Sequence, residues 1–262
     1  MATLSLPIDS IYGVLLIFFR VAAIVFSAPI FDTASIPVTF KAGLGLAVSV
    51  LLLPVVNAVV VVENLSLTTF VIGIVSEIAI GATIGLSVKL LFTGIQLAGQ
   101  VAGHQMGFAI ANVVDPATSV QIPVLSQFYN LTAMLVFLAI NAHHMFFAAL
   151  VESYTLVPPL SLQLNPQLIG MMMQLAGNMF VVAVKVGAPL IAVMLMVSVG
   201  LGLVARTVPQ IHIFIVGMPL KLLIGMLFMA IVAPYMTAYL IDLFSSYQTT
   251  LFDLMKLMAH SR

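Results

Sequence analysis

Six charged side chains lie within long apolar runs, and they are the first residues that could do chemistry. Five are cations and one is a carboxylate. An unpaired cation at mid-bilayer costs at least about 2.5 kcal/mol on insertion scales, although a lysine near a segment end can reach the aqueous boundary. Because one carboxylate cannot neutralise five cations, we expect some of them to face other subunits, an aqueous lumen or the membrane boundary. They are Arg20, Lys41, Glu77, Lys89, Lys185 and Lys221.

The histidines and the known catalytic patterns add no candidate site. His143 and His144 are adjacent, so on a helix they would point about 100° apart and could not easily bind one metal ion from one face. No HExxH, GxSxG, GxxxxGK[ST] or GxGxxG pattern occurs. Cysteine is absent, which excludes disulfides and thiolate metal sites. We therefore expect no enzyme activity, no metal and no cofactor.

The composition indicates a membrane protein. Of the 262 residues, 63% are hydrophobic and 6% are charged, whereas a soluble domain is about half apolar and a quarter charged. The formal net charge is zero, so nothing suggests electrostatic binding of nucleic acid. The N-terminus has neither a basic region nor a cleavage motif of small residues, so we expect the first apolar stretch to stay in the mature protein.

The elements that must position these charges are long apolar segments, each reaching the ~20 residues that span a bilayer as a helix. Continuous apolar runs without alternation predict an all-α membrane protein, not a barrel. The third segment has no proline from Leu65 to Asn112. As one helix it would reach roughly 70 Å, so it must fold back or project beyond the membrane. The segments are Ile11–Phe31, Ile36–Val62, Leu65–Val114, Ile122–Val151, Leu168–Val204 and Ile211–Ile241.

Glycines recur at helical spacing in the third segment. Residues four apart share one helix face, and a glycine there lets a neighbouring backbone approach closely. The pattern predicts a tight helix–helix contact within the chain. The alternative is a contact between subunits or a hinge. One set consists of Gly81 and Gly85 between Glu77 and Lys89, and the other consists of Gly99, Gly103 and Gly107.

Prolines interrupt the last two segments. Pro189, Pro219 and Pro234 lie inside apolar runs, where a proline removes a hydrogen bond and bends a helix. We therefore expect long kinked helices and not a simple straight bundle. The short polar turn around Arg206 and Pro209 predicts that these two segments form an antiparallel hairpin.

The stretch 107–119 changes character, because small and β-branched residues lead into Asp115-Pro116. The proline disfavours helix at Asp115. Irregular backbone at membrane depth is tolerated only when it is buried in protein or lines a cavity. The stretch is therefore either an ordinary loop at the membrane edge or a constriction in a passage.

An ordered set of motifs runs along nearly the whole chain. It comprises Arg20 with Pro29-Ile30-Phe31, Pro37, Lys41-Ala42-Gly43-Leu44 and Pro54; Glu77 to Gly85; Ala98-Gly99, Gly103, Gln105 and Gly107-Phe108 with Asp115-Pro116; Asn141 to His144; and Ala205 to Phe214 with Gly217 to Lys221. Together these motifs resemble the FliR family of flagellar export-gate subunits, whose virulence-system relatives form the matching injectisome component. The chain departs from the usual family pattern at Ala142, where glycine is usual, and at His212, where asparagine is usual.

The resemblance implies an architecture and a set of partners. Residues 1–160 would be a FliP-like helical region, and residues 161–262 a FliQ-like hairpin with an amphipathic C-terminal tail. The chain would assemble with FliP-like and FliQ-like subunits into a helical core, with an FlhB-like subunit at its base and an FlhA-like ring nearby. This gate would conduct unfolded export substrates through the bacterial inner membrane at the flagellar basal body.

The resemblance also implies roles for individual residues. The loop near 108–119 corresponds to a pore plug, in which Phe108, Ile110, Val113 and Val114 would pack against a methionine gasket supplied mainly by FliP-like subunits. The expected plug residues are Phe108, Ile110, Asn112, Val113, Val114, Asp115 and Pro116. The expected buried or inter-subunit charges are Arg20, Glu77, Lys89, Lys185, Arg206 and Lys221.

Three alternatives stay open. The injectisome form of the same subunit is the nearest one. An ion-coupled secondary transporter could use Glu77, Lys89 or Arg20 as its relay, but such folds usually carry repeated halves, and this sequence shows no convincing internal repeat. An intramembrane hydrolase is the third, and the chain shows no nucleophile–base pairing to support it.

Overall fold

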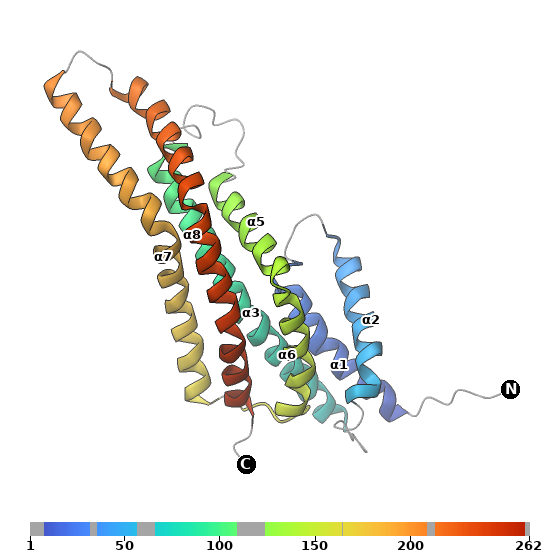
Figure 1. Ribbon diagram of the computed structural model, residues 1–262. Coiled ribbons are helices and arrows are strands. Elements are labelled where there is room, and N and C mark those ends of the chain that lie inside the picture. Colours follow the sequence, from blue (N-terminus) through green and yellow to red (C-terminus); the bar gives the residue numbers. More distant parts are fainter. Residues whose placement is uncertain are drawn as a thin grey trace. The chain divides into compact units, whose positions relative to one another are not determined.

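The computed structural model describes residues 8–31, 36–56, 66–108, 124–163, 165–208 and 213–259. Within these ranges every regular element is an α-helix (Figure 1), which confirms the prediction of an all-α membrane protein. The helices are α1 (Ile8–Ser27), α2 (Val38–Val56), α3 (Leu67–Gln105), α5 (Val124–Ala139), α6 (Ala142–Leu156), α7 (Pro166–Thr207) and α8 (Ile213–Met258).

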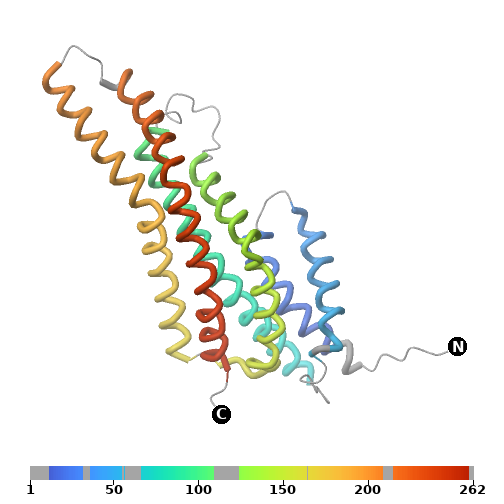
Figure 2. The backbone as a smooth tube through the Cα atoms, viewed as in Figure 1, coloured from blue at the N-terminus to red at the C-terminus, as the bar shows by residue number. Residues whose placement is uncertain are grey.

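Three helices are long and apolar enough to cross a membrane, and among the described residues these are α3, α7 and α8. They contain 39, 42 and 46 residues, which correspond to lengths of about 58, 63 and 69 Å. Figure 2 traces the backbone of these helices as long coils. Helix α3 does not fold back within its bounds. Even tilted by 40°, it would span about 44 Å along the membrane normal, against about 30 Å of hydrocarbon, so part of it lies outside the hydrocarbon.

The fourth apolar segment is broken into two helices. The sequence predicts one run over Ile122–Val151, whereas the structure has two helices, α5 and α6, with a break before Ala142. The joint is Asn141, whose backbone is left-handed with φ 56° and ψ 28°. Asparagine visits this conformation more readily than most residues, because its short polar side chain can bond locally. The expectation of an unbroken segment is therefore wrong at Asn141.

Residue contacts divide the chain into two compact units. Unit 1 comprises Met1–Leu90, Asn141–Leu175 and Ser246–Arg262, and unit 2 comprises Leu91–Ile140 and Ala176–Ser245. Helices α3, α7 and α8 each contribute to both units.

In unit 1, α1 and α2 form an antiparallel hairpin (Figure 1). Gly45 of α2 lies against Ala22 of α1, and Lys41 lies over the Phe26 ring. Helix α1 runs parallel to α3, because its residues from 16 to 27 meet α3 residues from 73 to 85 in the same order. The beginning of α7 is tied to the end of α8 by Asn165, whose side-chain amide donates to the Leu257 carbonyl at 2.8 Å.

In unit 2, an aromatic cluster joins three helices. Phe92 of α3 lies 5.7 Å from Phe137 of α5 and 5.4 Å from Phe244 of α8, measured between ring centroids. Phe137 and Phe244 meet edge to face at 5.3 Å, a favourable aromatic geometry. Helices α7 and α8 run antiparallel (Figure 1), and Gly217 lies against Leu201 near their junction.

Candidate functional site

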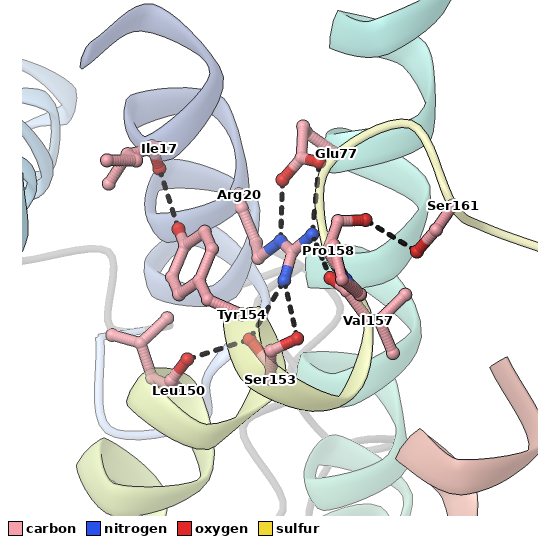
Figure 3. Close-up of polar contacts among 9 residues, drawn as sticks. All are labelled: Ile17, Arg20, Glu77, Leu150, Ser153, Tyr154, Val157, Pro158 and Ser161. Atoms are coloured by element: carbon pink, nitrogen blue, oxygen red, sulfur yellow. Dashed lines mark hydrogen bonds and ion pairs between the residues drawn. The ribbon is translucent and has the colours of Figure 1, made fainter. Parts of the chain in front are cut away.

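The strongest polar site in unit 1 is built around Arg20 and Glu77 (Figure 3). Both residues are fully buried, with 0% of either side chain exposed. Arg20 Nε donates to Glu77 Oε2 at 2.5 Å, and Nη2 donates to Oε1 at 3.0 Å. This bidentate geometry is the strong form of a charge-assisted hydrogen bond. The ion pair therefore joins α1 to α3 at a fixed register.

The same guanidinium also binds the C-terminal end of α6. Nη1 donates to the carbonyl of Ser153 at 2.9 Å and to its hydroxyl at 3.2 Å, and Nη2 donates to the carbonyl of Val157 at 2.9 Å (Figure 3). A helix C-terminus leaves carbonyls without helical partners and carries partial negative charge. With the two bonds to Glu77, all five N–H donors of Arg20 are used.

Tyr154 completes the surroundings of the guanidinium. Its ring centroid lies 4.2 Å from Arg20 Cζ, close enough for a cation–π interaction. Its hydroxyl donates to the carbonyl of Ile17 at 3.1 Å (Figure 3). The cluster of Arg20, Glu77, Ser153, Tyr154 and Val157, called the arginine cluster below, therefore ties α1, α3 and the end of α6 together.

Glycines allow α3 to approach α1 closely beside this cluster. A Cβ atom at Gly81 would lie 2.5 Å from the carbonyl oxygen of Arg20 and 2.8 Å from Ala23 Cβ. A Cβ at Gly85 would collide with the Ser27 side chain. Both positions lie one and two turns after Glu77, so the spacing of four places the ion pair and the close approach on one face of α3.

The second glycine set lies in unit 2 and is less uniform. A Cβ at Gly99 would lie 2.7 Å from Ser126 Cα on α5, while one at Gly103 would make an ordinary 3.5 Å contact with Leu125. Gly107 differs, because it has φ +92° and nothing within 4 Å of a built Cβ. Glycine suits this position because the backbone that ends α3 is left-handed there.

Two further glycines that the sequence spacing did not single out lie at close contacts in unit 2. A Cβ at Gly94 would lie 2.6 Å from the Met179 carbonyl oxygen on α7. A Cβ at Gly225 of α8 would lie 2.5 Å from Met106 Cε. Neither residue belongs to the repeated spacing, so only the structure reveals them.

The remaining predicted charges lie outside the arginine cluster. Lys185 and Arg206 are exposed on α7, whereas Lys89 and Lys221 are half-buried on α3 and α8. Phe108 is half-buried just beyond the end of α3. The other expected plug residues, Ile110, Asn112, Val113, Val114, Asp115 and Pro116, lie outside the described residues.

Sequence reasoning missed the α6 side of the arginine cluster. Ser153 and Val157 contribute mainly backbone carbonyls, and a carbonyl carries no signature in a sequence. Tyr154 offered a weak signal, because a tyrosine just after an apolar segment needs a partner for its hydroxyl when it is buried. The ion pair itself joins residues 57 positions apart, and spacing along one helix cannot predict such a contact.

The arginine cluster holds its two charges against each other, away from the surface of the chain. Its ion pair is buried, bidentate and surrounded by helix backbone, as in a structural brace. Together with the three candidate spans among the described residues, this defines a helical membrane protein with a buried, fully bonded ion pair.

Comparison with known proteins assigns the family. The sequence profile described as bacterial export proteins, family 1, matches residues 11–247. The chain therefore belongs to this family, and specifically to its FliR members.

Named relatives match the chain over most of its length. It is 29% identical over 260 residues to the flagellar biosynthetic protein FliR of Bacillus subtilis (strain 168), covering 97% of this chain and 98% of the relative. The FliR protein of Pectobacterium carotovorum subsp. carotovorum is 30% identical, with 93% of both chains covered. The FliR protein of Escherichia coli (strain K12) is 31% identical over 237 residues, covering 90% of this chain and 89% of the relative.

Proposed function

We propose that this chain is a structural, pore-forming subunit of the flagellar type III protein export gate in the bacterial inner membrane. It works there without catalysis, at the flagellar basal body, and helps to conduct unfolded flagellar proteins. Family membership supports a role in export. One observation supports the structural part of the proposal. Helices α7 and α8 carry more apolar surface than the hydrocarbon core of a bilayer can cover.

This excess of apolar surface follows from helix length and burial. Helices α7 and α8 are about 63 and 69 Å long, about twice the thickness of the hydrocarbon core. Only 11% of the most apolar stretch of α8 is buried within this chain. Apolar surface outside the hydrocarbon and outside the chain must be covered by something else. Other protein helices are the cover we propose.

Lys185 supports the same proposal. It is exposed on α7, on the helix face that carries Val181 and Ala188, which are also exposed. A lysine among apolar residues is unfavourable against acyl chains but suits a neighbouring subunit that presents an acidic or carbonyl group. The partners we propose are FliP-like, FliQ-like and FlhB-like subunits, with an FlhA-like ring nearby.

The arginine cluster weighs against the transporter alternative. A relay residue must gain and lose a proton or an ion during each cycle. Arg20 instead has an acceptor for every N–H donor, and Glu77 binds it through both oxygens. This arrangement is expected of an ion pair that stays formed and holds the helices together.

We also propose the two-part organisation and the plug. Residues 1–160 act as the FliP-like part, and residues 161–262 act as the FliQ-like hairpin with its C-terminal tail. The loop near 108–119 closes the pore. Phe108 supports this placement, because it lies half-buried at the point where the chain leaves α3 and enters that loop.

Co-purification tests the proposed function. The tagged chain is expressed with and without FliP-like and FliQ-like subunits from the same genome, and secretion of flagellar proteins is measured in a strain lacking its own FliR. We expect a stable complex and restored secretion. A chain that is stable and transports ions alone, without binding these subunits, would contradict the gate role.

Lys185→Glu sharpens this test. If Lys185 faces a partner's acidic or carbonyl group, the reversed charge should lower recovery of the complex more than tenfold, because like charges across an interface cost several kcal/mol. Lys185→Arg is the matched control and should assemble normally. The Lys185→Glu chain should unfold at the wild-type temperature, since the side chain is exposed.

Deleting residues 110–116 tests the plug. A purified complex carrying the deletion, reconstituted in liposomes, should leak small ions faster than the complex with the full loop. Unchanged conductance would reject the plug while leaving the subunit's place in the gate unaffected.

A further inference from the structure

A cavity of 280 Å³ lies within unit 2. It is bounded by the end of α3, the last turns of α7 and the first turns of α8. Most of its wall is apolar or glycine, but a few polar groups converge on it, as in small-molecule sites. The residues that decide its chemistry are His104, Ser198, Gly202, Gly217 and Lys221.

Lys221 gives the cavity a positive charge, and among the described residues of unit 2 no acidic side chain lies near it. In the described part of unit 2 the acidic residue is Asp242 and the other cations are Lys185 and Arg206. Asp242 lies about 32 Å from Lys221 along α8, well beyond the screening length at physiological salt. The ion pairs among the described residues involve other side chains. The cavity therefore favours an anionic occupant.

The other polar groups can complement an anion that also carries hydroxyl groups. His104 Nδ1 lies 2.8 Å from the carbonyl of Gln100, so Nδ1 carries the proton and Nε2 is left available. Ser198 donates its hydroxyl proton to the carbonyl of Met194 at 2.8 Å, so its oxygen is left to accept. His104 Nε2 and the Ser198 oxygen thus lie beside the Lys221 donor as groups that can accept hydrogen bonds.

The surface beside the cavity is apolar. Val199 and Leu203 of α7 are 64% and 62% exposed, and each follows a residue that lines the cavity. Leu220, which precedes Lys221, is 38% exposed. Acyl chains could lie along these side chains while a polar headgroup occupies the cavity.

We propose that this cavity binds the headgroup of an anionic phospholipid, with phosphatidylglycerol as the chemical type. Its phosphate would pair with Lys221, and its glycerol hydroxyls would donate to His104 and Ser198. Basic pockets between helices of membrane proteins are suited to such headgroups. The apolar surface beside the cavity favours a lipid over a free phosphate, and the zwitterionic choline headgroup offers no net charge to Lys221.

Glycines in α7 leave room for the cavity, and two of them offer a matched pair of substitutions, one in the cavity wall and one outside it. A Cβ at Gly202 would meet nothing within 4 Å, so a larger side chain there can enter the cavity without striking backbone. Gly200 lies on the same helix, is equally free of neighbours and does not line the cavity. Gly202→Leu should therefore fill the site, and Gly200→Leu should leave it open.

Native mass spectrometry of the purified full-length chain in detergent tests the proposal. Phosphatidylglycerol and phosphatidylcholine with identical acyl chains are titrated against the wild type, Lys221→Met, Lys221→Arg, Gly202→Leu and Gly200→Leu. Glycerol 3-phosphate serves as the headgroup alone. Thermal unfolding of each variant without lipid shows whether it is folded. Lys221→Arg conserves the positive charge, so it shows whether the lipid preference follows the charge and not the lysine itself.

We expect the wild type, Lys221→Arg and Gly200→Leu to prefer phosphatidylglycerol. Lys221→Met should weaken phosphatidylglycerol binding about fivefold, the usual effect of one basic residue at an anionic lipid surface. Gly202→Leu should abolish the preference. Equal binding of the two lipids by the wild type, or an undiminished preference in folded Lys221→Met and Gly202→Leu, would overturn the proposal. Binding of glycerol 3-phosphate as tight as that of the lipid would also overturn it. The assay involves no export, so its outcome is independent of the gate function.

Discussion

Both carboxylate oxygens of Glu77 accept hydrogen bonds from Arg20, so a single ion pair joins α3 to α1 at a depth where neither side chain reaches the surface. The same arginine holds two backbone carbonyls at the end of α6. Three helices that are distant in the sequence therefore depend on one guanidinium. This dependence makes the stability of unit 1 sensitive to a few substitutions.

Removing either partner of the ion pair should destabilise the chain strongly. Glu77→Ala leaves Arg20 buried and unpaired, which typically costs about 3–5 kcal/mol. Arg20→Ala should cost at least as much, because the carbonyls of Ser153 and Val157 also lose a donor. Thermal unfolding in detergent measures both. The double variant should lose less than the sum of the single losses, and strict additivity would contradict a direct coupling.

Gly81→Ala should be destabilising although alanine favours helix. The new Cβ would lie 2.5 Å from the Arg20 carbonyl oxygen, so α1 and α3 must separate. Overpacking of this kind costs about 1–3 kcal/mol. Gly170→Ala, on α7 in the same unit with nothing within 4 Å, is the control and should gain about 0.5–1 kcal/mol from helix propensity. Equal unfolding temperatures for the two variants would show that α1 and α3 are not in close contact at Gly81.

Gly94→Ala should cost more than Gly225→Ala, although both glycines lie at similar distances from their neighbours. The Cβ at Gly94 would meet a backbone carbonyl of Met179 at 2.6 Å, whereas the Cβ at Gly225 would meet only side-chain atoms of Met106, with Cε at 2.5 Å and Cγ at 2.8 Å. A methionine can change rotamer, but a helix backbone cannot move independently. We expect about 1–3 kcal/mol for Gly94→Ala. Denaturation of the two variants in parallel measures the difference, and a larger loss for Gly225→Ala would contradict it.

Asn141 should tolerate glycine and reject valine. Its φ of 56° is readily adopted by glycine, so Asn141→Gly should leave stability nearly unchanged. A β-branched residue is strained in this conformation, and Asn141→Val should cost about 1–2 kcal/mol. Thermal unfolding again distinguishes the variants. If the valine variant were as stable as wild type, the break between α5 and α6 would not depend on a left-handed residue.

The helical fold follows from composition and the lengths of the apolar runs. Within the described residues, five of the six predicted segments correspond to single helices, because a continuous apolar run in a membrane has few alternatives to helix. The end of α8 was harder to predict, since the predicted segment ends at Ile241 while the helix continues to Met258. Polar residues after Ile241 lower hydropathy without disfavouring helix, so hydropathy alone underestimates its length.

The candidate site was only partly predictable, for a physical reason. Glu77, Gly81 and Gly85 are spaced four residues apart, and this spacing can be read from the sequence as one face of a helix. Their partners on α1 do not, because contacts between distant helices depend on packing. The carbonyls of Ser153 and Val157 belong to the backbone and are independent of residue type. Sequence patterns therefore identified one side of the contact, and the structure supplied the other.

The parts of the arginine cluster all come from the first three-fifths of the chain. They are complete once Val157 has been made, before translation reaches α7 and α8. During synthesis on the ribosome, the early helices can therefore acquire their fixed register while the C-terminal hairpin is still absent. A hairpin that is made later would meet helices that are already bonded to one another, which leaves fewer wrong pairings open to a chain this rich in apolar helices.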